Sequence, residues 1–451
     1  MKPINIIRKT ACFTLLYVLA AGIASGQHSV LPSREIKSRL DTWLIPYVEE
    51  KDFSGVVLLG QGEYVLQQKA YGLADDESGK ANQLNTKFRI ASLTKTFTAA
   101  GIVMLADQGK LKLDDPLTKF FPDFPNGQNI QVEHLLLHRS GVGRLSEAKH
   151  MRTCFSRDEL VAEIGRQPRT NGGYSNEGYN LLAAIIEKVS GETYDNFLRR
   201  NIFGPLKMND SGSLCSGTTN GMATGHLAGG APKTSAKIPF NQFVQIGSGS
   251  IYSTAPDLLK WLKAIDEDRL FDIDKWRYPY GWGRREYGGK KLIEQSGIVE
   301  GFNSYIALYP AEKLFVVYLS NIQSGLFSRL PLDLKAAAFG GELTSPPKAQ
   351  ANASKSGRLE EYVGEWRTPP IPVPLNVSSK NGTLHFTFGN DPFSRPLTPL
   401  GGDRFFHRVE YADITFERDI SGRVVTMKWQ SGNGEPLVFA RTEPVDRGKK
   451  P

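Results

Sequence analysis

A serine and a lysine three positions apart, Ser92 and Lys95, are the first residues of this sequence whose types and spacing could do chemistry. They open a segment with apolar residues at helical spacing, which ends at Gly109. Side chains three apart share one face of a helix, so the lysine amine is predicted to reach the serine hydroxyl. A serine hydroxyl is a weak nucleophile until a base activates it. The pair therefore predicts nucleophilic catalysis, and a surface Ser and Lys on an ordinary amphipathic helix is the competing interpretation.

The Ser-x-x-Lys pattern is not specific by itself, because it occurs three times in the chain. Ser345 and Lys348 enclose two prolines, which a helix interior does not accommodate. Ser146 and Lys149 follow a glycine-rich turn and precede no long apolar repeat. Only Ser92 begins a sustained helical pattern, so the chemistry is assigned there.

A tyrosine and an asparagine two positions apart, Tyr174 and Asn176, lie on a turn before a second helical pattern. A tyrosine can act as a general base when a nearby cation lowers its pKa. An asparagine can orient an amide group. Alone, a Tyr-Ser-Asn turn is more often an ordinary helix cap, so this pair gains its meaning only together with Ser92.

Residues 1–26 have the pattern of a secretory signal peptide. A basic start precedes an apolar core over 11–24 and a small-residue cleavage site at 24–26. The core is too short for a comfortable membrane span, although an uncleaved anchor is the alternative. We therefore predict a periplasmic or secreted protein with no stable membrane span after cleavage.

Side chains that bind metals give no convincing pattern. His134 and His138 have the spacing of a helical zinc pair, but Leu135 stands where a zincin needs glutamate. We interpret both histidines as structural and expect no metal and no cofactor. Cys154 and Cys215 could pair in an oxidising compartment, or stay as two buried thiols.

The length of the chain limits the number of domains, and its charge limits the classes of partner. The chain has 451 residues, which is too long for one ordinary domain. Its formal net charge of +8 includes three basic residues of the leader, and the other lysines and arginines are scattered. Nucleic acid is therefore not an expected partner. A small-molecule or peptide substrate is expected, and the oligomeric state stays open.

The elements that must position the reactive residues have mixed α and β character. A proline- and serine-containing linker over 343–357 separates residues 34–342 from a C-terminal part, residues 358–445. That part consists of short alternating segments between turns, which predicts an all-β barrel or curved sheet. In the N-terminal part we predict helices over 36–48, 92–108, 181–189 and from 254, and strands over 53–59, 64–70, 291–294, 304–309 and 314–320.

Ser92-x-x-Lys95 and Tyr174-x-Asn176 together resemble the motifs of the penicillin-recognising serine hydrolases. That superfamily includes class C β-lactamases, D-alanyl-D-alanine carboxypeptidases, D-aminopeptidases and related esterases. The resemblance implies a β-lactamase/transpeptidase-like α/β fold, with an antiparallel sheet flanked by helices and a helical subdomain. The C-terminal part resembles the lipocalin-like domains appended to some of these proteins. Further stretches similar to the family are 133–141, 247–257, 280–283 and 301–321.

The resemblance implies a role for each candidate residue. Ser92 would attack a carbonyl and form an acyl-enzyme. Lys95 and Tyr174 would share the proton transfers, and which of them is the base stays open. Asn176 would hold the substrate amide or the Lys95 side chain. The backbone N–H groups of Ser92 and Ile298 would form the oxyanion hole.

The third motif departs from the family pattern. The family has Lys or His, then Thr or Ser, then Gly, whereas this chain has Gln295, Ser296 and Gly297, which we assign to substrate binding. A glutamine brings no charge to lower the pKa of Tyr174 or to attract a carboxylate, although it can donate and accept hydrogen bonds. The sequence thus predicts an exported serine hydrolase, a peptidase, D-aminopeptidase or esterase, with a neutral ester or amide favoured. The alternative is a catalytically weak ligand-binding or sensor protein of the same fold.

Overall fold

The computed structural model describes ten segments of the chain. The predicted signal peptide, Cys154, Cys215 and residues 348–357 of the predicted linker lie outside them. Within the described segments, no helix has the length and apolar character to cross a membrane. The segments are 29–145, 156–214, 220–228, 235–237, 246–271, 280–347, 359–369, 371–389, 394–431 and 435–442.

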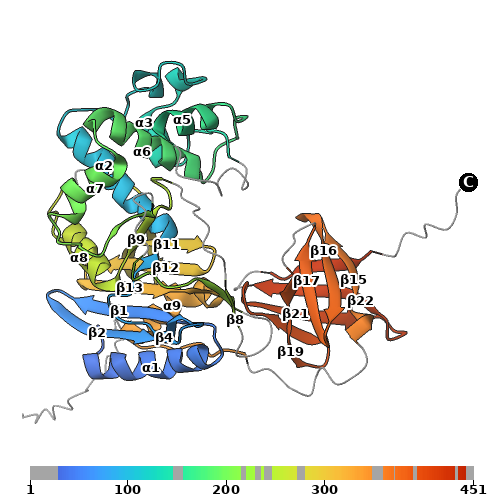
Figure 1. Cartoon of the computed structure of the whole chain (residues 1–451). Helices are drawn as coiled ribbons and strands as arrows, with labels where there is room; N and C mark the ends of the chain where they lie inside the picture. The colour runs from blue at the N-terminus through green and yellow to red at the C-terminus, as the bar shows by residue number, and fades with distance from the viewer. Residues whose placement is uncertain are drawn as a thin grey trace, which may run out of the picture.

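A six-stranded antiparallel sheet, in the order β10-β11-β12-β13-β1-β2, forms the centre of the N-terminal domain (Figure 1). Strands from distant parts of the sequence meet where β1 pairs with β13, from Gly55 opposite Ser320 to Gln61 opposite Leu314. The central strands β12 and β13 are buried along their whole length. The strands are β1 (Gly55–Gln61), β2 (Tyr64–Tyr71), β10 (Gly283–Tyr287), β11 (Lys290–Val299), β12 (Phe302–Tyr309) and β13 (Leu314–Ser320).

Helices cover both faces of this sheet, which explains the continuous burial of its central strands. One face packs against α1 (Ser33–Glu49) and α9 (Leu326–Phe339). The other packs against α8 (Ala255–Asp266) and the almost entirely buried α2 (Thr94–Asp107). Trp261 of α8 stacks on Phe97 of α2 with ring centroids 4.5 Å apart. The predicted helices and the β1–β2 hairpin are confirmed.

A helical subdomain stands beyond the sheet, at the top of Figure 1. It contains α3 (Val132–Leu136), α5 (Arg157–Gly165) and α6 (Asn176–Ser190), and α7 (Tyr194–Leu198) follows. The side chain of Ser175 caps α6 by accepting from the N–H of Gly178, and the helix ends at Gly191 with a φ of 74°. Helix α6 packs against α2, and the contact of Lys95 with Asn176 places the starts of the two helices side by side.

Short elements connect these layers. A three-stranded sheet consists of β5 (Phe88–Arg89), β9 (Ile251–Ser253) and β6 (Gly212–Ser213), and its strand β5 precedes α2 in the sequence. The remaining short elements of this domain are β3 (Leu73–Asp75), β4 (Lys80–Ala81), β7 (His226–Ala228), β8 (Ser235–Lys237), β14 (Ile322–Gln323), η1 (Ala91–Leu93), η2 (Leu117–Lys119), η3 (Gly127–Asn129) and η4 (Arg199–Phe203).

The C-terminal domain is a nearly closed antiparallel barrel, drawn in orange and red in Figure 1. It has its own core, built around Trp366, Phe386 and Phe416. The predicted all-β module is confirmed. Its strands follow the turn η7 (Leu359–Glu361) and are β15 (Gly364–Thr368), β16 (Ile371–Lys380), β17 (Thr383–Phe388), β18 (Arg395–Pro396), β19 (Thr398–Gly401), β20 (Arg404–His407), β21 (Ala412–Arg418), β22 (Val424–Ser431) and β23 (Leu437–Arg441).

The turn between β20 and β21 fastens the barrel to the N-terminal domain. Arg408 forms an ion pair of 2.8 Å with Asp52, and both side chains are about 5% exposed. The N–H of Gly325 donates to the carbonyl of Arg408 across 2.8 Å. The hydroxyl groups of Tyr411 and Tyr47 lie 2.8 Å apart. These contacts join the barrel to the region of α1 and α9.

Candidate active site

Ser92 lies in the 3-10 turn η1, which runs directly into α2. Side chains three apart eclipse in 3-10 geometry, so Ser92 and Lys95 face one another as the spacing predicted. Ala91 has a φ of +46°, a left-handed conformation that costs a non-glycine residue about 1–2 kcal/mol. Strained residues of this kind cluster at functional sites. The strand pairing of β5 with β9 fixes the chain just before this turn.

Lys95 is completely buried, and its amine contacts three oxygen atoms. The Nζ atom lies 3.0 Å from Ser92 Oγ, 2.7 Å from Asn176 Oδ1 and 2.9 Å from the carbonyl oxygen of Ser248. Burial lowers the pKa of Lys95 to about 7, and the negative charge of Glu177 opposes that shift in part. A lysine in this position is neutral in a substantial fraction of molecules at neutral pH.

Tyr174 and Asn176 reach the same point from the start of α6. The Tyr174 hydroxyl lies 2.8 Å from Ser92 Oγ, and the Lys95 amine lies 4.9 Å from the centre of the Tyr174 ring. Burial raises the pKa of the Tyr174 hydroxyl, whereas its hydrogen bond with Ser92 lowers it. The structure therefore brings together all four residues that the first two motifs contributed: Ser92, Lys95, Tyr174 and Asn176.

The third motif lies inside β11, which runs without a break from Lys290 to Val299. The strands predicted over 291–294 and 304–309 leave this motif in the connection between them, and that placement is wrong. Small residues at 296 and 297 hide the strand pattern, but the ladder with β12 continues through them. A Cβ atom on Gly297 would lie 2.4 Å from the carbonyl oxygen of Ile90 and 3.0 Å from the nitrogen of Ser92. Glycine is therefore required for β11 to approach the nucleophile this closely.

The Gln295 side chain is engaged by the backbone at both ends. Its Nε2 atom donates to the carbonyl of Gly281 across 2.6 Å, and its Oε1 atom accepts from the N–H of Ser296 across 2.9 Å. Gly281 has a φ of +82°, and a Cβ atom there would lie 2.7 Å from the carbonyl oxygen of Lys95. Gln295 thus ties the 280–282 segment between β11 and α2. Ser296 and Ile298 are exposed beside it.

Two further residues act on the cluster without having been predicted as part of it: His138 contacts it, and Glu177 acts on Lys95 through its charge. The ring of His138 stacks on the ring of Tyr174, with centroids 4.6 Å apart. Glu177 is buried, and its Oε1 atom accepts from the N–H of Leu145 across 3.0 Å. A carboxylate directly after the Tyr-Ser-Asn motif was the available signal for Glu177. The sequence predicted a structural role for His138, but its spacing gave no sign that the ring stacks on Tyr174.

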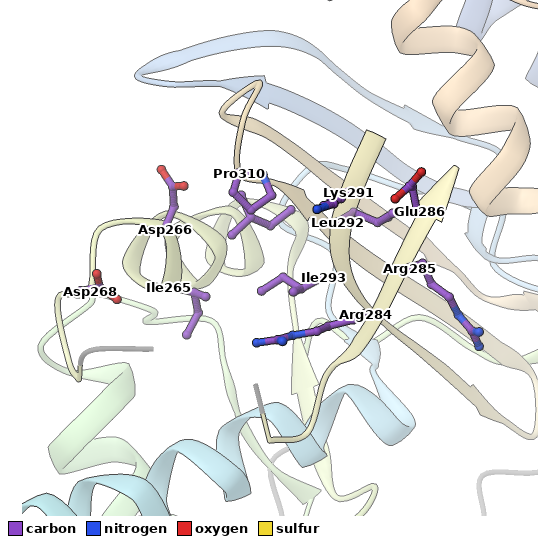
Figure 2. A pocket seen from close by; sticks show the side chains of 11 residues that line it. Ile265, Asp266, Asp268, Arg284, Arg285, Glu286, Lys291, Leu292, Ile293 and Pro310 are labelled. Carbon is purple, nitrogen blue, oxygen red and sulfur yellow. The ribbon is translucent and has the colours of Figure 1, made fainter. Parts of the chain in front are cut away.

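A separate pocket of about 600 Å³ lies between α8 and the β10–β11 edge of the sheet (Figure 2). Its floor is apolar, with Ile265 and Ile293, and its rim is charged. Two of the rim charges have partners outside the pocket: Asp266 pairs with Lys313, and Arg285 pairs with Glu294. No predicted site residue lines it. Among the described residues, no group of three or more His, Cys, Asp or Glu side chains could hold a metal ion.

Two family models match the chain. The model described as Beta-lactamase matches residues 40–339, and a domain of unknown function, DUF3471, matches residues 348–441. The PbpX protein of Bacillus subtilis (strain 168) is 29% identical over 62% of this chain and 73% of its own length. A penicillin-binding protein of the same bacterium is 25% identical over 89% of this chain and 98% of its own length.

Solved structures share the fold. The D-amino acid amidase of Ochrobactrum anthropi SV3 superposes with a TM-score of 0.55 and 26% identity, over 64% of this chain and 91% of the amidase. An octameric penicillin-binding protein homologue from Pyrococcus abyssi superposes with a TM-score of 0.57 and 22% identity, over 91% of this chain and 100% of that one. The second likeness concerns the fold alone, and it extends over the C-terminal part as well.

Proposed function

Because this chain belongs to the beta-lactamase family of serine hydrolases, we propose that it cleaves an amide or ester through an acyl-enzyme on Ser92. The observation that carries the proposal is the contact of one hydroxyl with two proton-transfer groups. Ser92 Oγ lies 3.0 Å from the Lys95 amine and 2.8 Å from the Tyr174 hydroxyl. Those distances allow a proton to leave the nucleophile and to reach a leaving group within one site.

Lys95 is the better base of the two. Burial favours its neutral form, whereas burial makes the phenolate form of Tyr174 harder to reach. A neutral amine has two N–H groups and one lone pair. Asn176 Oδ1 and the carbonyl oxygen of Ser248 can only accept, so they take the two N–H groups. The lone pair is then left for the Ser92 hydroxyl.

The reaction follows from that assignment. Ser92 Oγ forms a bond to the substrate carbonyl carbon while its proton moves to Lys95 Nζ. The backbone N–H groups of Ser92 and Ile298 would stabilise the resulting oxyanion, at about 3 kcal/mol per donor. The bond to the leaving group then breaks, and Tyr174 relays the proton from Lys95 to the departing nitrogen or oxygen. Water attacks the acyl-enzyme by the same steps in reverse order.

The substrate is proposed to be a neutral amide or ester. Gln295 occupies the position at which the family motif carries a cation, and backbone groups hold both ends of its amide. A substrate carboxylate would therefore meet no positive charge from this motif. The amidase from Ochrobactrum anthropi was crystallised with L-phenylalanine amide, which has no free carboxylate, and also with D- and L-phenylalanine, which have one. We extend the proposal to amino-acid amides and esters, and to peptides whose carboxylate lies away from Gln295.

The chain is further proposed to act after export to a periplasm or to the outside of the cell. The support is the predicted signal peptide over residues 1–26. Determining the N-terminal residue of the mature protein after expression in a bacterium with a secretion system tests this. Cleavage near residue 26 is expected, and an intact N-terminus on a cytoplasmic protein would contradict it.

Intact-mass spectrometry tests the proposed chemistry. The protein is incubated separately with penicillin, with an activated short-chain ester and with phenylalanine amide, and adducts and products are followed. We expect an acyl adduct on Ser92 and product release, both lost in Ser92→Ala. Ser190→Ala, at the end of α6, is the matched control and should keep full activity. Ligand binding that survives Ser92→Ala, without turnover in the natural sequence, would instead support the weak-binding alternative.

A further inference from the structure

His138 lies just after α3, at the edge of the cluster formed by Ser92, Lys95 and Tyr174. Its ring stacks on Tyr174 with centroids 4.6 Å apart and an interplanar angle of 29°. The same ring lies 5.0 Å from the Tyr179 ring, one turn into α6. His138 therefore contacts the proposed proton relay on one side and the buried interior of the helical subdomain on the other.

The imidazole also holds the backbone between the two residues of the second motif. Its Nδ1 atom accepts from the N–H of Ser175 across 3.0 Å, and Ser175 separates Tyr174 from Asn176. One rigid ring thus touches the side chain of Tyr174 and the main chain that sets the direction of both neighbours. A shift of this ring would move Tyr174 relative to Ser92 and Asn176 relative to Lys95.

The ring stays in the form that this contact requires. Accepting at Nδ1 needs an unprotonated nitrogen. Burial and the neighbouring Lys95 lower the pKa of His138 to about 4, so the ring is neutral at any ordinary assay pH. Its backbone has a φ of +57°, in the left-handed region where His and Asn are enriched among non-glycine residues.

Tyr174 depends on such support because half of its surface is exposed to solvent. Besides Ser92 and His138, the Lys95 amine lies 4.9 Å from its ring centre, and Arg144 donates to its carbonyl oxygen across 3.1 Å. A half-exposed side chain whose hydroxyl must stay within 2.8 Å of Ser92 Oγ needs a neighbour that fixes the plane of its ring. The face of His138 is the surface that does this.

We propose that His138 is a positioning residue, which holds the Tyr174 ring and the Ser175 backbone in the correct position relative to the nucleophile, Ser92. This inference rests on the proposed acyl-enzyme chemistry and adds a residue to it. His138 itself touches no reacting atom. Its loss should therefore slow the acylation step and leave the binding of the substrate largely unchanged.

Three substitutions separate the two contacts of the ring. His138→Ala removes both the stacking and the acceptor. His138→Asn keeps an acceptor atom near the Nδ1 position and tolerates the left-handed backbone. His138→Phe keeps an aromatic face but removes the acceptor. His134→Ala is the matched control, because His134 belongs to the same stretch and its Nδ1 atom caps α3 by accepting from Gln131.

Rapid-mixing kinetics with an activated neutral ester measure the acylation rate constant and the substrate dissociation constant separately. We expect His138→Ala to lower the acylation rate constant by roughly 10- to 100-fold, since small misplacements of catalytic groups cost that much. His138→Asn and His138→Phe should each recover part of the rate, and His134→Ala should match the natural sequence. The substrate dissociation constant should change by less than about threefold.

The outcomes separate this inference from the proposed function. If the natural sequence forms no acyl adduct, the proposed function fails first. If it does, and folded His138→Asn and His138→Phe both acylate at the natural rate, the positioning role is overturned. A loss confined to substrate binding would also overturn it. Should His138→Ala fail to fold, the Asn and Phe variants still decide the question.

Discussion

The Nζ atom of Lys95 lies 2.7 Å from Oδ1 of Asn176, and this contact joins the start of α2 to the start of α6. The central helix of the N-terminal domain and the main helix of the helical subdomain thus meet at one buried amine. The protonation state of that amine decides whether the hydrogen bond between Lys95 and Asn176 is charge-assisted or neutral. The chemistry of the site is therefore expected to respond to pH through Lys95.

Hydrolysis of a neutral ester should become faster as the pH rises through about 7. Burial lowers the pKa of Lys95 to about 7, so the amine loses its proton near that pH and becomes able to accept one from Ser92. The ratio kcat/KM, measured from pH 5 to 9, should rise along a single limb and then level off. A flat profile across this range would contradict the assignment of Lys95 as the base.

Glu177→Gln should move that limb to lower pH. The carboxylate of Glu177 raises the pKa of Lys95, so its removal should lower that pKa further. A glutamine keeps an Oε1 atom that can still accept from the N–H of Leu145. The measurement is the same kcat/KM profile, and Glu159→Gln in α5 is an exposed control whose profile should not move. A limb that stays in place in Glu177→Gln would refute the electrostatic role.

Gln295→Lys should increase the preference for substrates that carry a carboxylate. The new ammonium would stand where the family motif has its cation, and it would attract the anion. We expect the ratio of kcat/KM for a carboxylate-bearing ester to that for its neutral analogue to rise by roughly tenfold, or about 1.4 kcal/mol. Gln295→Glu should lower the same ratio. Equal ratios in all three proteins would show that position 295 does not select charge.

Breaking the interdomain ion pair should destabilise the whole chain. Arg408→Met leaves the carboxylate of Asp52 buried without its partner, which typically costs about 3–5 kcal/mol. Asp52→Leu should cost a similar amount, and the double variant should lose less than the sum of the two. Urea unfolding at pH 8 is the measurement, because burial raises the pKa of Asp52 to about 6 and the carboxylate is charged above it. Additive losses would show that the pair contributes no coupling.

The sequence predicted the helices that carry the site more completely than the contacts that complete it. The Ser92 helix and the α6 helix have apolar repeats and clear ends, so spacing located Ser92 and Lys95, whereas Tyr174 was assigned only together with Ser92 and through the family resemblance. These residues come together only in the tertiary structure, because α2 and α6 are far apart in the sequence. The family resemblance implied that these residues come together, and the structure gives the distances between them.

Other parts of the site depend on segments of backbone that lie close together in the fold. The periodicity of apolar residues in the sequence does not reveal such contacts. The strand character of residues 295–299 comes from the ladder with β12, whereas the glycine and serine there read as a loop. The contact between His138 and Tyr174 depends on a left-handed turn after α3. The hydrogen bond from Gln295 to the carbonyl of Gly281 depends on the positive φ of Gly281. None of these conformations has a sequence signature strong enough to predict it alone.

The pairing of β1 with β13 has a consequence for the order in which the protein forms during synthesis. Gly55 lies opposite Ser320, so β1 cannot pair with β13 until nearly the whole N-terminal domain has left the ribosome. Gly297, which packs on the nitrogen of Ser92, belongs to the same late part of the chain. A nascent chain that stops before about residue 320 therefore has its serine and lysine but no assembled site. Hydrolytic activity should appear abruptly with length, and only in chains that have passed that point.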